Sequence, residues 1–125
     1  MIKIKEIAFT AYAVSSIPKA RAFYEGVLGL TPSSEYPIKD ENEKEGWVEY
    51  NIGSGTLGIG CSPDFWKPSQ DGASMALEVE NFDEAVAYVK EKGVPIVMGP
   101  NDFPSCTMIV ISDPDGNKLT LHHKK

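Results

Sequence analysis

Hydrophobic residues follow the same plan twice along the chain. Each half opens with a stretch of alternating apolar residues, which predicts a β-strand because successive strand side chains point to opposite faces. Apolar residues at helical spacing follow, and then three further short alternating stretches. The segments 12–30 and 77–95 align without a gap at a constant offset of 65 residues. The pattern therefore predicts two βαβββ modules, about 1–62 and 72–125, within a single domain.

Both predicted helices carry the signals of helix ends. Ser16 and Asn81 precede the first turns, where a side-chain oxygen can accept hydrogen bonds from free backbone N–H groups. Gly29 and Gly93 follow the last turns, where a residue with positive φ ends a helix at little cost. Apolar residues between these signals recur at helical spacing. We therefore expect one amphipathic helix in each module.

Glycine and proline mark the connections between the predicted strands. The sequence Asp-Pro-Asp-Gly (113–116) predicts a turn before the last strand, because Pro presets φ and Gly permits φ > 0. NIGSGTLG (51–58) predicts a hairpin in the first module. A link rich in Pro, Ser and Gly (61–74) joins the modules. Its Phe65 and Trp66 are expected either to form a lid over a ligand or to pack against a partner subunit.

Composition narrows the class of protein. The chain has 125 residues, a net charge of −6 and an isoelectric point near 4.8, so its surface repels phosphate backbones and nucleic acid is not an expected partner. No apolar run approaches 18 residues and no export signal is recognisable, which predicts a cytoplasmic protein without a membrane partner. Cys61 and Cys106 are too few for a disulfide framework and are expected to be free, structural thiols.

Two motifs within the repeated plan resemble a known family. AFYEGVLGL (22–30) and the late DPDGN (113–117) make the chain similar to the glyoxalase/bleomycin-resistance/extradiol-dioxygenase superfamily, also called the vicinal oxygen chelate fold. The resemblance covers nearly the whole chain. It implies an α+β fold in which two curled mixed sheets surround a cleft, with the helices on the convex side, and it implies a homodimer. Function is not specified, because that scaffold carries many chemistries.

Strand alternation sorts side chains between the core and the implied cleft. Leu119 and Leu121 are the apolar set of the last strand, so Thr120 and His122 face the cleft and His123 is an end residue in solvent. The same reasoning along the other strands gives an aromatic and polar ligand site, whose predicted members are Phe9, Trp47, Glu49, Asn51, Ser74, Thr120 and His122. A hollow lined in this way suits a small organic molecule.

Two glycines are expected to enlarge this site. Gly58 and Gly60 alternate with apolar residues on their strand, so both face the cleft. Because glycine has no side chain, they are expected to open space beside Trp47.

The metal ligands of the superfamily have no counterparts here. Metal-dependent members place four ligands, His and Glu, on the first and last strands of both halves. Carried over, these positions are Phe9, Gly58, Ser74 and Thr120, which do not supply the imidazole, carboxylate or thiolate donors that such metals need. Even with Glu49 the set stays incomplete. We therefore expect neither a metal nor another cofactor.

Three functions stay open after these observations. The first is a metal-free protein that binds a drug-like or metabolic small molecule, as the bleomycin-resistance branch does. The second is a metal-free isomerase or lyase in which Glu49 and His122 act as an acid–base pair; a purely structural hydrogen bond between them is its alternative. The third, a metal-dependent lyase or dioxygenase, is the one that the ligand positions oppose. We expect the first.

Overall fold

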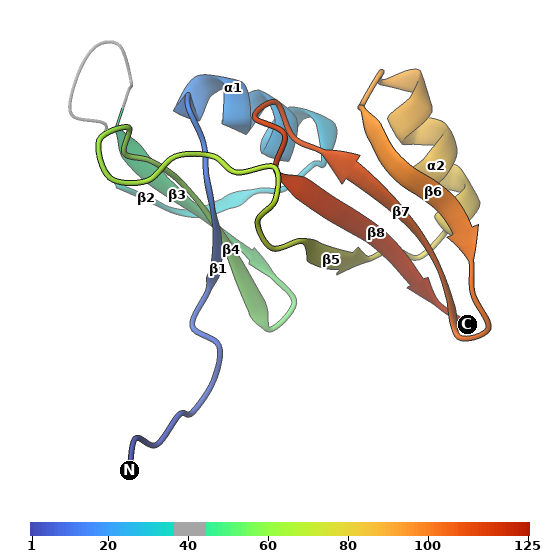
Figure 1. The fold of residues 1–125 in the computed structure, drawn as a ribbon, viewed down its shortest axis with the longest axis horizontal. Coiled ribbons are helices and arrows are strands. Elements are labelled where there is room, and N and C mark those ends of the chain that lie inside the picture. The colour runs from blue at the N-terminus through green and yellow to red at the C-terminus, as the bar shows by residue number, and fades with distance from the viewer. Residues whose placement is uncertain (37–44) are drawn as a thin grey trace. The chain divides into compact units, whose positions relative to one another are not determined.

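The computed structural model describes residues 1–36 and 45–125, which form two compact units, Met1–Pro68 and Ser69–Lys125 (Figure 1). The boundary between them falls inside the predicted link. The predicted polar loop KDENEKEG (39–46) lies largely outside the described residues. That the two units make up one domain, with a cleft between its sheets, stays a prediction.

The first unit contains a four-stranded mixed sheet and one helical segment. Its elements are β1 (Thr10–Ala13), α1 (Ile17–Arg21), the π-helical turn η1 (Ala22–Val27), β2 (Pro32–Tyr36), β3 (Gly46–Ile52) and β4 (Gly55–Cys61). The strand order is β1-β4-β3-β2, with β1 parallel to β4 and the other neighbours antiparallel. This is the βαβββ plan predicted for the first module.

The second unit repeats the plan with different residues. Its elements are β5 (Met75–Glu78), α2 (Phe82–Glu91), β6 (Ile96–Asp102), β7 (Cys106–Ser112) and β8 (Lys118–Lys124). The order β5-β8-β7-β6 is equivalent, strand for strand, to that of the first unit, and β5 runs parallel to β8. The internal repeat and the α+β class are therefore confirmed.

The first strand is shorter than predicted. Apolar alternation predicts a strand from Ile2 onward, yet β1 begins at Thr10, which pairs with Leu57 of β4. Because β4 itself begins at Gly55, a strand extended back to Ile2 would run past the end of β4, its neighbour in the described sheet. Residues 1–9 instead run away from the sheet of their unit (Figure 1). Strand pairing, which alternation alone does not report, sets this boundary.

The helix ends follow the predicted signals. Ser16 Oγ accepts a hydrogen bond from the backbone N–H of Lys19, and Asn81 Oδ1 accepts one from that of Glu84. Gly29 and Gly93 adopt φ of 75° and 69° just beyond the helices. These contacts satisfy N–H groups that a first helical turn leaves without partners.

Each core lies between one face of a sheet and its own helix. In the first unit the ring of Tyr24, from η1, stacks on Tyr12 and Tyr50, with centroid distances of 6.5 and 6.2 Å. In the second unit α2 contributes Val89 to a core shared with the helix-facing residues of β7 and β8, namely Ile109, Ile111, Leu119 and Leu121. Alternation then places the predicted site residues on the opposite face of each sheet.

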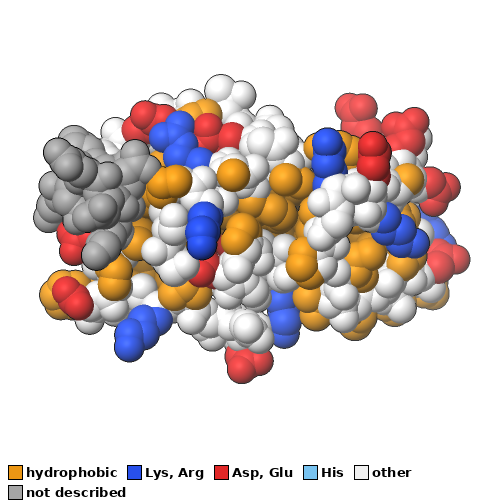
Figure 2. Space-filling view, turned by 90° about the horizontal axis from the view of Figure 1, so that it is seen from above, with side chains coloured by type: hydrophobic (Ala, Val, Ile, Leu, Met, Phe, Trp, Pro, Cys, Tyr) orange, Lys and Arg blue, Asp and Glu red, His pale blue; other side chains and the backbone are white. Residues whose placement is uncertain are grey.

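The described surface mixes charges of both signs. Figure 2 shows Asp and Glu side chains gathered over the α2 end of the second unit, with Lys and Arg among them. Asp83 and Glu84 lie in the first turn of α2 and Lys90 in its last turn, an arrangement that favours the helix dipole. Within residues 1–36 and 45–125, no helix is long and apolar enough to cross a membrane. Cys61 and Cys106 are both free thiols.

Candidate functional site

Two glycines seat the indole of Trp47 on the open face of the first sheet. Trp47 pairs with Gly60, and its neighbour on the same face, Glu49, pairs with Gly58. A Cβ atom added to Gly58 would lie 2.7 Å from Trp47 Cζ2, and one added to Gly60 would lie 2.7 Å from Trp47 Cε3. Such distances are shorter than van der Waals contact, so the ring lies against both glycines. The prediction that these glycines open free space is therefore wrong: Trp47 fills it.

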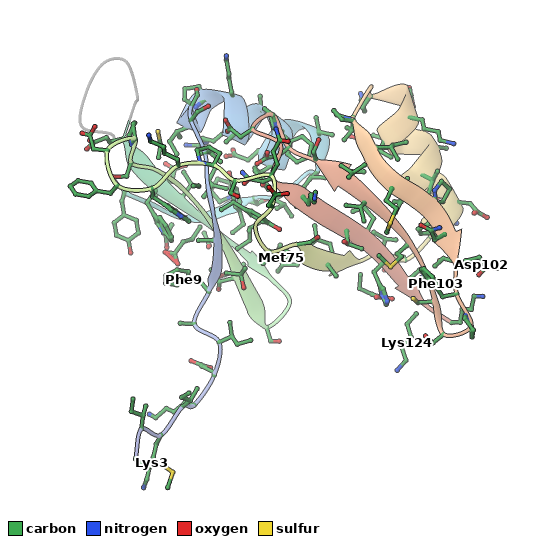
Figure 3. All side chains as sticks on the ribbon, in the orientation of Figure 1. Lys3, Phe9, Met75, Asp102, Phe103 and Lys124 are labelled. Atoms are coloured by element: carbon green, nitrogen blue, oxygen red, sulfur yellow. The ribbon has the colours of Figure 1, made fainter. Side chains whose placement is uncertain are left out.

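Phe9 and Trp66 complete an aromatic cluster around Trp47. Phe9, where the N-terminal stretch joins β1 (Figure 3), meets Trp47 edge to face at 5.3 Å between ring centroids. Trp66 stacks on Trp47 with centroids 6.4 Å apart and an angle of 27° between the rings. Phe9 and Trp66 remain 50% and 38% exposed. We call Phe9, Trp47 and Trp66 the aromatic cluster; it offers ring surface to a ligand.

The link between the modules positions Trp66 by backbone contacts. Ser62 and Trp66 form an isolated β-bridge, and the Trp66 N–H donates to the Ser62 carbonyl oxygen at 2.8 Å. Phe65, which the sequence placed beside it, is 91% exposed. Trp66 thus packs within its own unit, and the predicted lid and subunit contact both stay predictions.

Glu49 lies on the same sheet face as the cluster. Its backbone carbonyl accepts a hydrogen bond from Ser33 Oγ at 3.1 Å. Within the described part of the chain its carboxylate makes no hydrogen bond and no ion pair. The neighbouring Asn51 is engaged, because its Oδ1 accepts from Thr56 Oγ1 at 3.1 Å. The open face of the first sheet therefore carries a half-buried carboxylate that has no counter-charge among the described residues.

The residues at the family's metal positions lack the donor groups of a transition-metal site. On the second unit, Ser74 Oγ and Thr120 Oγ1 lie 2.9 Å apart and hydrogen-bond to each other. On the first unit, Phe9 and Gly58 have no donor atom in their side chains. No group of three or more His, Cys, Asp or Glu side chains that could hold a metal ion occurs among the residues described. The residues at these positions do not fit the metal that the family would imply.

His122 has a partner within its own sheet. Its Nδ1–H donates to Glu78 Oε1 at 2.5 Å, and Glu78 Oε2 accepts the backbone N–H of Lys124 at 2.7 Å. These contacts, that of the Lys124 N–H first, hold the pKa of the Glu78 carboxyl below its usual value. Glu78 is not among the site residues that the sequence predicts. Pairing of the two residues follows from the parallel register of β5 and β8.

His123 lies on the opposite face of β8 from His122. Its Nδ1–H donates to the Val79 carbonyl oxygen at 2.7 Å, and its side chain is only 40% exposed. It is more exposed than His122, whose side chain is 30% exposed, but the hydrogen bond to Val79 holds its ring in place. The ring lines a shallow hollow of about 390 Å³ beside the start of α2, together with Glu80, Asn81, Phe82, Asp83, Thr107 and Lys125. Thr120 and His122 lie on the other face, and a contact between Glu49 and His122 stays a prediction.

A network of charged groups supports the first sheet from its helix side. The Tyr50 hydroxyl, on a fully buried residue, donates to Glu25 Oε2 at 2.8 Å. Arg21 donates from Nε to the same Glu25 oxygen and from Nη2 to Glu35 Oε1, each at 2.6 Å. Sequence reasoning missed this network, although Arg21 and Glu25 have the i, i+4 spacing of a helical ion pair. Through Tyr50 the network connects the helical segment to β3, the strand that carries Trp47 and Glu49.

Ionisation of the Tyr50 hydroxyl should lower the free energy of unfolding at alkaline pH. Burial raises the pKa of its hydroxyl, and the hydrogen bond to Glu25 raises it further. An acid whose folded pKa exceeds its unfolded value, about 10 for Tyr, stabilises the fold below that pH and loses the contribution as the pH rises above it. We expect the free energy of unfolding of Tyr50→Phe to fall less between about pH 9 and pH 11 than that of the wild type.

Urea unfolding at several pH values measures this difference. Tyr88→Phe, at an exposed position on α2, is the matched control. Its free energy of unfolding should change with pH as that of the wild type does. Equal alkaline losses in Tyr50→Phe and the wild type would contradict the assignment.

Comparison with known proteins identifies the class. The sequence profile of the Glyoxalase/Bleomycin resistance protein/Dioxygenase superfamily matches residues 6–121. The chain belongs to this superfamily. A comparison with curated protein sequences finds no match.

Solved structures agree with the fold over nearly the full length. A glyoxalase family protein from Enterococcus faecalis is 30% identical, with a TM-score of 0.72, and the match covers 94% of this chain and 97% of that one. A putative glyoxalase family protein from Bacillus anthracis is 25% identical, with a TM-score of 0.73, and the match covers 100% of this chain and 99% of that one. TnmS3, an antibiotic binding protein from Streptomyces sp. CB03234, is 23% identical, with a TM-score of 0.78 and complete coverage of both chains.

Proposed function

We propose that this protein binds a small organic molecule with an aromatic ring, and that it does so on the aromatic cluster without a protein-bound metal. The observation that carries the proposal is the set of partly exposed rings of Phe9, Trp47 and Trp66 on the open face of the first sheet. Exposed aromatic surface costs free energy in water, and a flat apolar ligand would cover it.

The comparisons and the donor set support the same proposal. TnmS3, which shares the fold, is an antibiotic binding protein. The residues at the family's ligand positions, Phe9, Gly58, Ser74 and Thr120, do not offer the donors of a transition-metal site. The remaining polar candidates of the ligand site are Glu49, Asn51 and His122, which would orient a bound molecule.

Tryptophan fluorescence tests the proposal directly. The chain has two tryptophans, and both belong to the aromatic cluster, so the emission of the protein reports on this site. A panel of planar aromatic compounds, titrated with and without added Zn²⁺ and with EDTA, should contain saturable quenchers whose affinity does not depend on the metal. Saturable binding that leaves tryptophan emission unchanged, or that requires Zn²⁺, would contradict the proposal.

A metal-free isomerase or lyase is the second candidate. It is favoured by the imidazole of His122, which Glu78 fixes through Nδ1, so that Nε2 is the nitrogen left for proton transfer. Glu49 would be the second acid–base group. Any compound that quenches tryptophan emission should be incubated with the wild type and with His122→Ala. Conversion by the wild type, lost in the variant, would establish catalysis, whereas recovery of unchanged compound from the wild type would exclude it for that ligand.

We expect the protein to be a homodimer, as the family resemblance implies. Large apolar side chains that are exposed in the single chain are consistent with a subunit contact, among them Ile2, Ile4, Ile7, Val97 and Met98. Light scattering at micromolar concentration should give twice 13.7 kDa. A species of 13.7 kDa alone would contradict this prediction. A cytoplasmic location likewise stays a prediction from the sequence.

A further inference from the structure

We infer that the preferred ligand of the aromatic cluster is a planar aromatic cation, whose positive charge lies beside Glu49. This inference rests on the proposed function and narrows it from aromatic molecules in general to those with a positive charge. Two residues along β3 from Trp47, Glu49 projects from the same face, and its partner across the strands is Gly58.

The ring of Trp47 extends to Gly58, the residue that pairs with Glu49 across the strands. Gly58 has no side chain, and the Cζ2 and Cη2 atoms of Trp47 lie against it. The other cross-strand neighbour of Glu49, Ser34, belongs to β2 and is exposed. Glu49, two positions from Trp47 on the same sheet face, therefore has no basic side chain as a partner among the described residues.

A bound cation would satisfy both groups at once. The face of an indole is electron-rich and attracts a cation within about 6 Å of its centroid. A carboxylate alongside adds a charge–charge attraction, which grows as the ligand displaces water. Trp66, stacked on Trp47, and Phe9, at its edge, give the rest of a planar ligand apolar contact.

A neutral or anionic ligand would fit less well. A neutral aromatic molecule that covers the cluster would remove water from Glu49 and return no partner, and loss of solvation without a partner opposes binding. An anion would add repulsion from the carboxylate. The net charge of −6 acts in the same direction for ligands that approach the protein.

Matched probes separate charge from shape. The cation 10-methylacridinium and neutral acridine, at pH 8, share one ring system, and anthracene-9-carboxylate presents a similar ring system with a negative charge. Dissociation constants would be measured by equilibrium dialysis, with tryptophan quenching to show that the probes reach the cluster. We expect the cation to bind roughly 10-fold more tightly than acridine at low salt, the carboxylate to bind most weakly, and added NaCl to weaken the cation alone.

Glu49→Gln tests the residue, with Glu91→Gln as the matched control. Glu91 is an exposed residue of α2, so this control removes one negative charge without altering the first sheet. Glu49→Gln should weaken the cation about 10-fold, which corresponds to about 1.4 kcal/mol, and should change acridine less than about 2-fold. Glu91→Gln should change neither probe by more than about 2-fold.

The possible failures are distinguishable. If the cation and acridine quench with equal affinity, or if Glu49→Gln leaves the cation unchanged, the charge preference is refuted and the aromatic site stands. If no probe binds at millimolar concentration, or if binding leaves tryptophan emission unchanged, both the inference and the proposed function are overturned.

Discussion

Replacing Asp113 by Ala should lower the free energy of unfolding by about 3 kcal/mol. Asp113 is 3% exposed and lies in the turn between β7 and β8. Its Oδ1 accepts the backbone N–H groups of Asp115 and Asn117, and its Oδ2 accepts the side-chain N–H of Asn117, each at 2.9 Å. Asn117 is equally buried, so alanine would remove the carboxylate that accepts from its backbone and side-chain N–H groups at a site with little access to water. Hydrogen bonds to a charged acceptor contribute about 1.5–3 kcal/mol each, and they are not fully additive.

Urea unfolding measures this loss against two further variants. Asp113→Asn keeps an oxygen at Oδ1 but turns an N–H₂ group toward the Asn117 amide. Its free energy of unfolding should therefore lie between those of the wild type and Asp113→Ala. Asp64→Ala removes a carboxylate from an exposed site and should stay within about 0.5 kcal/mol of the wild type. If Asp113→Ala were as stable as Asp64→Ala, the turn network would make no net contribution to folding.

Replacing Trp47 by Ala should weaken the binding of an aromatic ligand by about 30-fold or more. Trp47 is the one member of the aromatic cluster that contacts both of the others, and its ring covers Gly58 and Gly60. Its removal takes away ligand contact area and also the stacking partner that orients Trp66. Truncation of a central aromatic side chain in a binding site typically costs about 2 kcal/mol or more, which is roughly 30-fold in affinity.

Equilibrium dialysis with a quenching ligand found for the wild type measures the effect, and Trp66 still reports binding in the variant. Tyr88→Ala is the control, because it removes an exposed aromatic ring from α2 in the other unit. Its affinity should match that of the wild type. Retention of wild-type affinity in Trp47→Ala would show that the ligand binds elsewhere.

The candidate site was partly predictable from sequence. Period-2 alternation placed Trp47 and Glu49 on one face of β3, and Thr120 and His122 on one face of β8, as the structure has them. The pairing of His122 with Glu78 was not predictable, because the two residues are 44 positions apart and meet only through the parallel register of β5 and β8. Likewise, the contact of Trp47 with Gly58 and Gly60 depends on which strand lies beside β3.

The sequence alone determined the kind and order of the helices and strands, because these depend on interactions between residues close together in the chain. Helix caps at Ser16 and Asn81, the positive φ of Gly29 and Gly93, and the repeated βαβββ order all depend on residues a few positions apart. The tertiary structure decided where β1 begins, which carboxylate His122 contacts and whether two glycines leave space or hold a ring. Those outcomes depend on strand order and register, which the packing of residues far apart in the sequence selects.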